Sequence, residues 1–357
     1  MRAKDFDYDR YYAVFEPKQE NLRKFMRGEW KGPLLMQSAE GNIYFELANR
    51  KETSLESQLD NLTVKMDLHC DYTYSFLEPW CGVGVYANAF GAHLHYFDHS
   101  AVQTTPRYLH VEEVENVPEP NFKDVELMNV VIDYIKYFRE QTHDQLPICL
   151  TDTQSPNDTA SLILDPVELF MASVTEPESI DDFLLKVTKV IGDFTEQQIE
   201  LIGPCYHGPG HQFPSDSTIG GISLSDDNLA VISPASWVVS ARNYNDILAR
   251  RFGGIALHSC GVFSHSMKEL KESVGLNMLN FKISDFEPND PVLLAETFAG
   301  TDTILHPIIF PGEPYERLLP LMRDDVRMII NLATTGTVDE KNAQYDEMVE
   351  FFRPFRE

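Results

Sequence analysis

The sequence predicts an α/β protein built as a closed (β/α)8 barrel of the TIM type, with an N-terminal helical extension. Two observations lead to this prediction. From about residue 144 to the end of the chain, short apolar runs alternate with helical patterns, which is typical of repeated βαβ units and a parallel sheet. No linker-like segment interrupts the alternation, and such barrels typically run to about 250 residues as one domain. We therefore expect residues 1–357 to form a single domain, with residues 1–30 as the extension.

The extension is expected to end in a helix that docks by one face. In PKQENLRKFMRGEW, Leu22, Phe25 and Met26 follow at i, i+3 and i+4, the spacing of an apolar helix face. The early strands are harder to place. GPLLMQS at 32–38 and AHLHYF at 92–97 are candidates, and the aromatic, glycine-broken segment at 71–92 is expected to hold a long first loop.

The remaining elements supply the regular alternation. Strands are expected at residues 145–152, 219–227, 253–259, 277–283, 302–308 and 327–333. Helical patterns lie between and after them, at residues 158–173, 178–202, 233–252, 265–273, 290–298, 315–324 and 339–354. The helix at 233–252 opens with Ser-Pro, a common start signal.

Composition limits the partners. Acidic residues number 56 against 29 basic ones, which gives a net charge of −27, and such a surface repels nucleic acid and anionic membranes. The five cysteines are scattered, and neither a signal peptide nor an apolar run long enough to span a membrane is visible. We therefore expect a cytoplasmic protein that acts on a small molecule, with no nucleic-acid or membrane partner.

Polar residues gather where the predicted strands end. In a barrel of parallel strands these ends meet at one rim, which is where sites are built. The residues expected there are Asp152, Gln154, Asp226, Asp227, His258, Cys260, His306, Thr334 and Thr335.

His258 and Cys260 form the most specific pattern. They end the run GGIALHSC two residues apart, so in an extended strand both side chains point to the same side. Imidazole and thiolate are the donors that zinc prefers, and zinc needs at least one further protein ligand. His306 is one source, and Cys205 or His207 in the loop GPCYHGPGH is another. The alternative is a buried His beside a buried Cys, without a metal.

Asp226 and Asp227 are candidates for a general acid or a polar anchor for substrate. Adjacent strand residues point to opposite faces, so at most one of the two faces the barrel axis, and the sequence leaves open which one. The segment GVGVYA, with Gly82, Gly84 and Ala87, fits a loose dinucleotide-binding pattern. It does not follow a buried strand, because Glu78 and Pro79 precede it, so we reject a nicotinamide cofactor.

Several segments together resemble the uroporphyrinogen decarboxylase superfamily. They are ENLRKFMRGEWKGPLLMQ, TDTQSPNDTASLILDPVELFMASVTEPESIDDFLLKVT, GGISLSDDNLAVISPASW, GGIALHSCG and TTGTVDEKNAQYDEMVEFF. The resemblance implies a (β/α)8 barrel with its site at the C-terminal rim. It also implies one of two activities: metal-free decarboxylation of a tetrapyrrole, or zinc-dependent methyl transfer in which an H-x-C pair and a later Cys hold the metal and a corrinoid exchanges the methyl group.

The two branches of the superfamily differ at positions that can be compared with this sequence. The decarboxylase branch carries an Arg-rich segment after the first strand, whereas LLMQSAEGNIYFELANR has Glu40 and no Arg before Arg50. The methyltransferase branch matches at His258 and Cys260, but Thr occupies the region of its later Cys, near NLATTGTV. A hydroxyl is a weaker zinc ligand than a thiolate, so the third ligand must come from elsewhere. Glu40 and the two adjacent aspartates are the oxygen alternatives to His306, Cys205 and His207.

The resemblance therefore favours an enzyme that transfers a methyl group between a small donor or thiol and a corrinoid. Zinc would be held by His258, Cys260 and one further ligand, and a separate corrinoid protein is the implied partner. Asp226 or Asp227 would act with Asp152, Gln154 and Glu40 on the substrate. The alternatives are a metal-free decarboxylase of a tetrapyrrole or other cyclic acid, and a barrel that binds a corrinoid or tetrapyrrole without chemistry.

Overall fold

The computed structural model describes residues 1–39, 51–97 and 102–357. Glu40, proposed above as a substrate-binding or oxygen-ligand residue, lies outside these residues. Within the described chain, no helix is long and apolar enough to cross a membrane.

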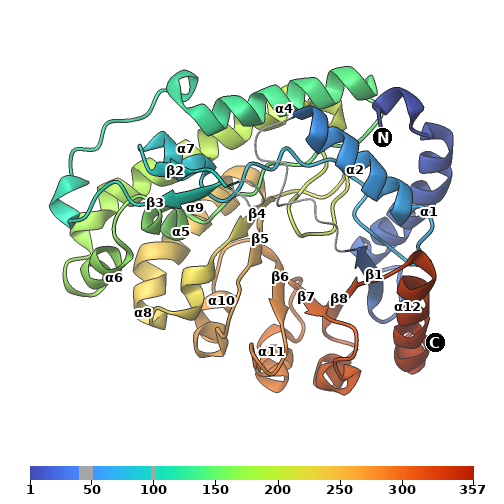
Figure 1. The fold of residues 1–357 in the computed structure, drawn as a ribbon. Helices are drawn as coiled ribbons and strands as arrows, with labels where there is room; N and C mark the ends of the chain where they lie inside the picture. The colour runs from blue at the N-terminus through green and yellow to red at the C-terminus, as the bar shows by residue number, and fades with distance from the viewer. Residues whose placement is uncertain (40–50, 98–101) are drawn as a thin grey trace.

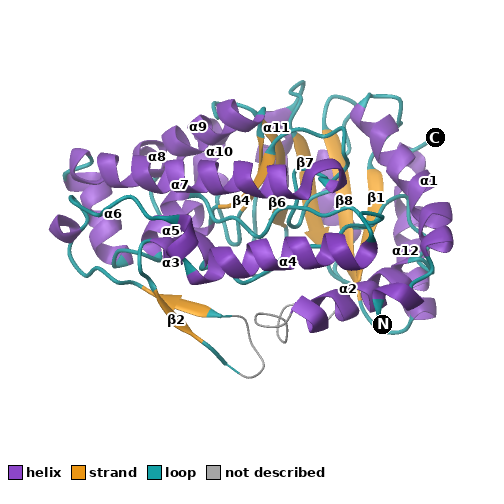
Figure 2. Cartoon of the chain, turned by 90° about the horizontal axis from the view of Figure 1, so that it is seen from above, coloured by secondary structure: helices purple, strands orange, loops and turns teal. Residues whose placement is uncertain are grey.

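A six-stranded parallel sheet forms the centre of the molecule. Its strands follow the order β1-β8-β7-β6-β5-β4, and every neighbouring pair is parallel. Helices lie outside this sheet in both views (Figures 1 and 2), as expected when each strand is connected to the next by a helix. The strands are β1 (Leu34–Ala39), β4 (Ile222–Ser225), β5 (Ile255–His258), β6 (Leu276–Lys282), β7 (Ile304–Ile309) and β8 (Arg327–Thr334).

The predicted strand at 145–152 is replaced by isolated bridges. Parallel bridges join Leu77 to Ile148 and Gln154 to Ser225, and another joins Met36 of β1 to Tyr72. Pro147 has no N–H to donate, which interrupts a regular ladder at this point. The structure therefore confirms an α/β fold with a parallel sheet, but the described residues do not form the closed ladder of eight strands that we predicted.

The predicted strand at 92–97 is present but lies outside the main sheet. β2 (His93–His95) pairs with β3 (Gln103–Thr105) as a separate antiparallel ribbon, which projects from one side of the molecule in Figure 2.

Most predicted helices are present, and prolines account for two of the differences. The helix predicted at 158–173 divides in two because Pro166 cannot continue the first helix and instead starts the second, which Asp165 caps. The segment at 315–324 contains Pro320 and forms a 3-10 helix. The α-helices are α1 (Tyr8–Met26), α2 (Lys51–Lys65), α3 (Val85–Ala89), α4 (Glu126–Thr142), α5 (Pro156–Ser161), α6 (Pro166–Thr175), α7 (Glu178–Ile202), α8 (Pro234–Trp237), α9 (Asn243–Phe252), α10 (Met267–Lys271), α11 (Pro291–Phe298) and α12 (Val338–Phe352).

The two faces of the sheet carry different cores. One apolar cluster includes Ala256, Met278, Ile304 and Ile329 from four neighbouring strands. Side chains two residues apart share a face, so residues His258, Asn280, His306 and Asn331 continue this face toward the carboxyl ends of the strands. The apolar inner face thus changes to polar side chains along each of these strands. The larger cluster fills the other face, under the helices.

Candidate metal centre

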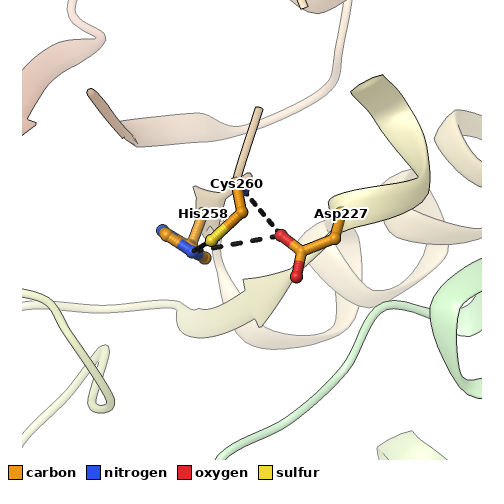
Figure 3. A group of neighbouring side chains, drawn as sticks. All are labelled: Asp227, His258 and Cys260. Carbon is orange, nitrogen blue, oxygen red and sulfur yellow. Dashed lines mark hydrogen bonds and ion pairs between the residues drawn. The ribbon is translucent and has the colours of Figure 1, made fainter. Parts of the chain in front are cut away.

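Asp227, His258 and Cys260 come together at the carboxyl ends of β4 and β5. One ligand atom from each residue lies within 4.8 Å of the other two. His258 is the last residue of β5, Cys260 follows two residues later, and Asp227 begins the 3-10 helix Asp227–Ala230 after β4. The three side chains converge in Figure 3. Among the described residues, these are the His, Cys, Asp or Glu side chains that come close enough together, three at a time, to hold a metal ion.

The distances within the group suit a shared cation. His258 Nε2 lies 3.1 Å from Cys260 Sγ and 4.0 Å from Asp227 Oδ1. The backbone N–H of Cys260 donates to Asp227 Oδ1 over 2.6 Å, which holds the carboxylate beside the thiol. Nitrogen, sulfur and oxygen donors in this number match a catalytic zinc site, which keeps a fourth position for substrate.

Asn280 fixes the orientation of His258. Asn280 Nδ2 donates to the carbonyl of His306 over 2.8 Å, so its Oδ1 faces the imidazole. His258 Nδ1 lies 2.6 Å from this oxygen and donates to it. The unprotonated Nε2 then faces Cys260. A ring N–H held in this way is the usual arrangement of a metal-binding histidine.

Replacement of Asn280 by Ala is expected to weaken metal binding. Loss of such a partner typically costs about 10–100-fold in metal affinity, because the imidazole is free to rotate or to change tautomer. Titration of zinc against a chromophoric chelator measures the change. Wild-type affinity in Asn280→Ala would show that the orientation of His258 does not depend on this hydrogen bond.

The loop that carries Cys260 is held by the segment after β6. Glu287 Oε2 accepts the N–H of Gly261 over 2.8 Å, and Asn289 Nδ2 donates to the Gly261 carbonyl over 2.9 Å. Gly261 has φ +104°, and a Cβ there would lie 2.9 Å from that of Ala230. The glycine after the H-x-C pair is therefore required both by its backbone conformation and by the close approach of the neighbouring loop.

Burial sets the protonation of both soft ligands. It lowers the pKa of His258, although Asp227 acts in the opposite direction, so the imidazole is neutral at neutral pH, as a ligand must be. Burial, followed by the charge of Asp227, raises the pKa of Cys260 to about 11. Without a cation this thiol stays protonated, whereas coordination to a metal deprotonates a thiol.

Asp226 lies apart from the metal group. Its Oδ2 accepts bonds from Trp237 Nε1 and Asn245 Nδ2, each at 3.0 Å, and burial raises its pKa to about 6. Asp226 therefore faces α8 and α9, while Asp227 faces the metal group. The structure resolves the choice between the two adjacent aspartates that the sequence left open.

His306 does not join His258 and Cys260. Its Nδ1 lies 2.8 Å from the carbonyl of Ile329, its ring packs near Phe213, and burial lowers its pKa to about 4. Thr334, in the region where the resemblance expects a later Cys, uses its hydroxyl to bond the Ser38 carbonyl at 3.2 Å.

Cys205 and His207 are also outside the group. Cys205 Sγ contacts the Asp144 carbonyl at 3.5 Å, and the pKa of His207, which burial lowers, responds to Asp216 and Arg23. Tyr206, between them, bridges to Ile148, near the start of the segment whose later residue Gln154 reaches β4. The loop GPCYHGPGH thus begins level with Ile148, well before the end of β5, and neither side chain belongs to the group.

A second polar cluster contains the predicted substrate-binding residues Asp152 and Gln154. Gln154 Nε2 donates to Asp152 Oδ1 over 3.2 Å, and the same oxygen lies 3.8 Å from His211 Nε2. His211 Nδ1 lies 2.6 Å from Glu78 Oε1. Gln154 bridges Ser225 of β4, and Ser225 pairs with His258 of β5, so the cluster neighbours the metal group.

His211 is held as a cation by its carboxylate neighbours. Burial alone would lower its pKa, but Asp152 and Glu78 together raise it to about 9. Glu78 was missed as a site residue because it lies in an irregular aromatic segment. Its acidic character within an otherwise apolar stretch, FLEPW, was the one signal available.

Comparisons with known proteins agree with this fold. Residues 71–204 match the family model of uroporphyrinogen decarboxylase. A methyltransferase from Methanosarcina mazei has a similar structure, with a TM-score of 0.66 and 15% identity, over 93% of this chain and 99% of that one. At this identity the likeness shows a shared fold. The sequence matches none of the curated proteins.

The family match covers the segment from the first loop through α7, and the structural match extends over nearly the whole chain. Both agree with the resemblance to the uroporphyrinogen decarboxylase superfamily: residues 71–204 match its family model, and a methyltransferase shares the fold.

Proposed function

We propose that this protein is a zinc-dependent methyltransferase that exchanges a methyl group between a small donor or thiol and a corrinoid. The observation that carries the proposal is the convergence of Asp227, His258 and Cys260, whose ligand atoms lie within 4.8 Å of one another. The methyltransferase of similar fold supports it further. The third ligand is the carboxylate of Asp227, one of the oxygen alternatives that the sequence offered.

Zinc held by these three donors supplies Lewis acidity, which lowers the pKa of a thiol or hydroxyl bound in the fourth position. The residues of the chain prepare this position. Asn280 directs His258 Nε2 inward, and the N–H of Cys260 orients the Asp227 carboxylate. Asp152 and Gln154, neighbours of the metal group, would orient the substrate.

We also propose that the fold is a closed barrel and that the protein works in a reducing compartment. The bridges at Tyr72, Leu77, Ile148 and Gln154 support a barrel whose wall is completed by residues 72–77 and 148–154. The five cysteines are all unpaired, which suits a reducing, cytoplasmic compartment. A corrinoid, free or on a partner protein, would be the second reactant.

Metal analysis of the purified protein tests the proposal. We expect about one zinc per chain in the wild type and little in His258→Ala, since three protein ligands are the usual minimum for such a site. His95→Ala is the control, because exposed His95 bonds Thr105 in the separate β2–β3 ribbon. Absence of zinc from the wild type after reconstitution, or equal zinc in His258→Ala, would exclude this mechanism and leave a metal-free decarboxylase as the alternative.

A further inference from the structure

Asp158, a buried residue of α5, forms a hydrogen-bonded link to the metal group across a long sequence separation. Its Oδ2 accepts the N–H of Asp227 over 2.6 Å, and its Oδ1 accepts the N–H of Asn228 over 3.0 Å. Asp227 in turn accepts the N–H of Cys260 over 2.6 Å. Helix α5, the 3-10 helix after β4 and the loop after β5 are therefore joined by successive hydrogen bonds from a backbone N–H to a carboxylate.

The 3-10 helix that begins at Asp227 lacks a cap of its own. Asp226 occupies its N-cap position without a side-chain capping bond, and its Oδ2 instead accepts from Trp237 and Asn245. Asp158 supplies the missing acceptors from helix α5. Asn157 strengthens the link, since its Oδ1 accepts from Asn228 Nδ2 over 2.9 Å.

The charge of Asp158 is costly in this position. The side chain is only 5% exposed, and among the described residues no ion pair includes it. A neutral side chain would cap a helix at lower cost. A cation held by Asp227, whose N–H the Asp158 carboxylate accepts, would offset part of this cost.

We propose that Asp158 is a positioning residue of the metal centre: it fixes the backbone of Asp227, and through the Asp227 carboxylate it fixes the Cys260 loop. This inference rests on the proposed function for its metal-binding consequence. Its structural part, the link from Asp158 to the Cys260 amide, can be tested in protein free of metal.

The test compares Asp158→Asn with wild type in two measurements. The amide keeps the volume of the side chain but places an NH2 group against one of the two backbone N–H donors. We expect zinc affinity, measured by competition with a chromophoric chelator, to fall by about 10–100-fold. In metal-free protein, we expect amide hydrogen exchange of the segment 258–262 to be faster by about tenfold.

Asp165→Ala is the matched control. Asp165 caps α6 by accepting the N–H groups of Val167 and Glu168, so its loss removes two capping bonds and destabilises the protein. Zinc affinity and exchange at 258–262 should nevertheless stay at the wild-type level.

The outcomes separate this inference from the proposed function. Unchanged exchange at 258–262 in Asp158→Asn overturns the inference, and so does wild-type zinc affinity in that variant. If the wild type binds no zinc, the proposed function fails, and the exchange measurement alone decides whether Asp158 positions the Cys260 loop.

Discussion

Asp227→Asn is expected to lower zinc affinity by on the order of 100-fold or more while the protein stays folded. The change removes a charged oxygen donor from a set of three, so the loss should be at least as large as that seen for residues that only support a ligand. Asp227 is half-exposed, with 50% of its side chain accessible, so its neutralisation should alter the fold little. Equilibrium dialysis against buffered zinc measures the affinity, and methyl transfer should fall with it.

Asp226→Asn is the matched control, since it makes the same chemical change one residue earlier. The asparagine oxygen can still accept from Trp237 and Asn245, and the side chain faces away from the metal group. We expect a change in zinc affinity smaller than the roughly 10-fold loss typical of a residue that supports a metal ligand, because Asp226 contributes no atom to the metal group. Asp226 Oδ1 has no hydrogen-bond partner among the described residues. An NH2 group at this position would also be unpaired, which lowers the free energy of unfolding by roughly 1–3 kcal/mol. The reverse ranking of the two variants would show that Asp226 is the ligand.

The stability of the protein is expected to fall between about pH 6.5 and pH 9 because of His211. Its folded-state pKa of about 9 lies above the unfolded value of 6.5. The stabilisation from its proton is therefore complete below pH 6.5 and is lost as the pH rises through 9. For a fully buried group a shift of this size corresponds to roughly 3 kcal/mol in the free energy of unfolding.

The measurement is denaturant unfolding at several pH values, with wild type compared to His211→Gln. The difference between their free energies of unfolding should shrink across this window. Other titrating groups cancel in the comparison: Lys65, whose pKa burial lowers to about 8, and His306, which titrates at lower pH, are common to both proteins.

Glu78→Gln provides an independent check. It removes the carboxylate that bonds His211 Nδ1 and keeps Asp152, the other carboxylate that raises the pKa of His211. In Glu78→Gln, the loss of unfolding free energy with rising pH should be smaller and should be complete at a lower pH than in wild type. A constant difference between wild type and His211→Gln over the whole range would show that His211 is not held as a cation.

The later strands and their helices follow closely from the sequence. The pattern predicted a helix at 178–202, which is α7, and strands that overlap β4 to β8. These elements are fully buried on one face or both, so their apolar periodicity is strong. The early part was predicted less well, because Pro147, Pro79 and the aromatic segment at 71–92 interrupt regular pairing, and bridges replace a ladder there.

The sequence by itself determined the pairing of His258 with Cys260, because alternation along a strand brings residues two apart to one side. It also determined that both lie at a strand end and that a glycine follows. Only the tertiary structure decided that Asp227 completes the group, that Asp226 faces the helices, and that Cys205, His207 and His306 lie elsewhere. These choices depend on which loops meet at the end of β5. Long-range contacts decide which loops lie side by side, such as the hydrogen bond from the Asp227 N–H to the Asp158 carboxylate. Such contacts leave no periodic pattern in the sequence.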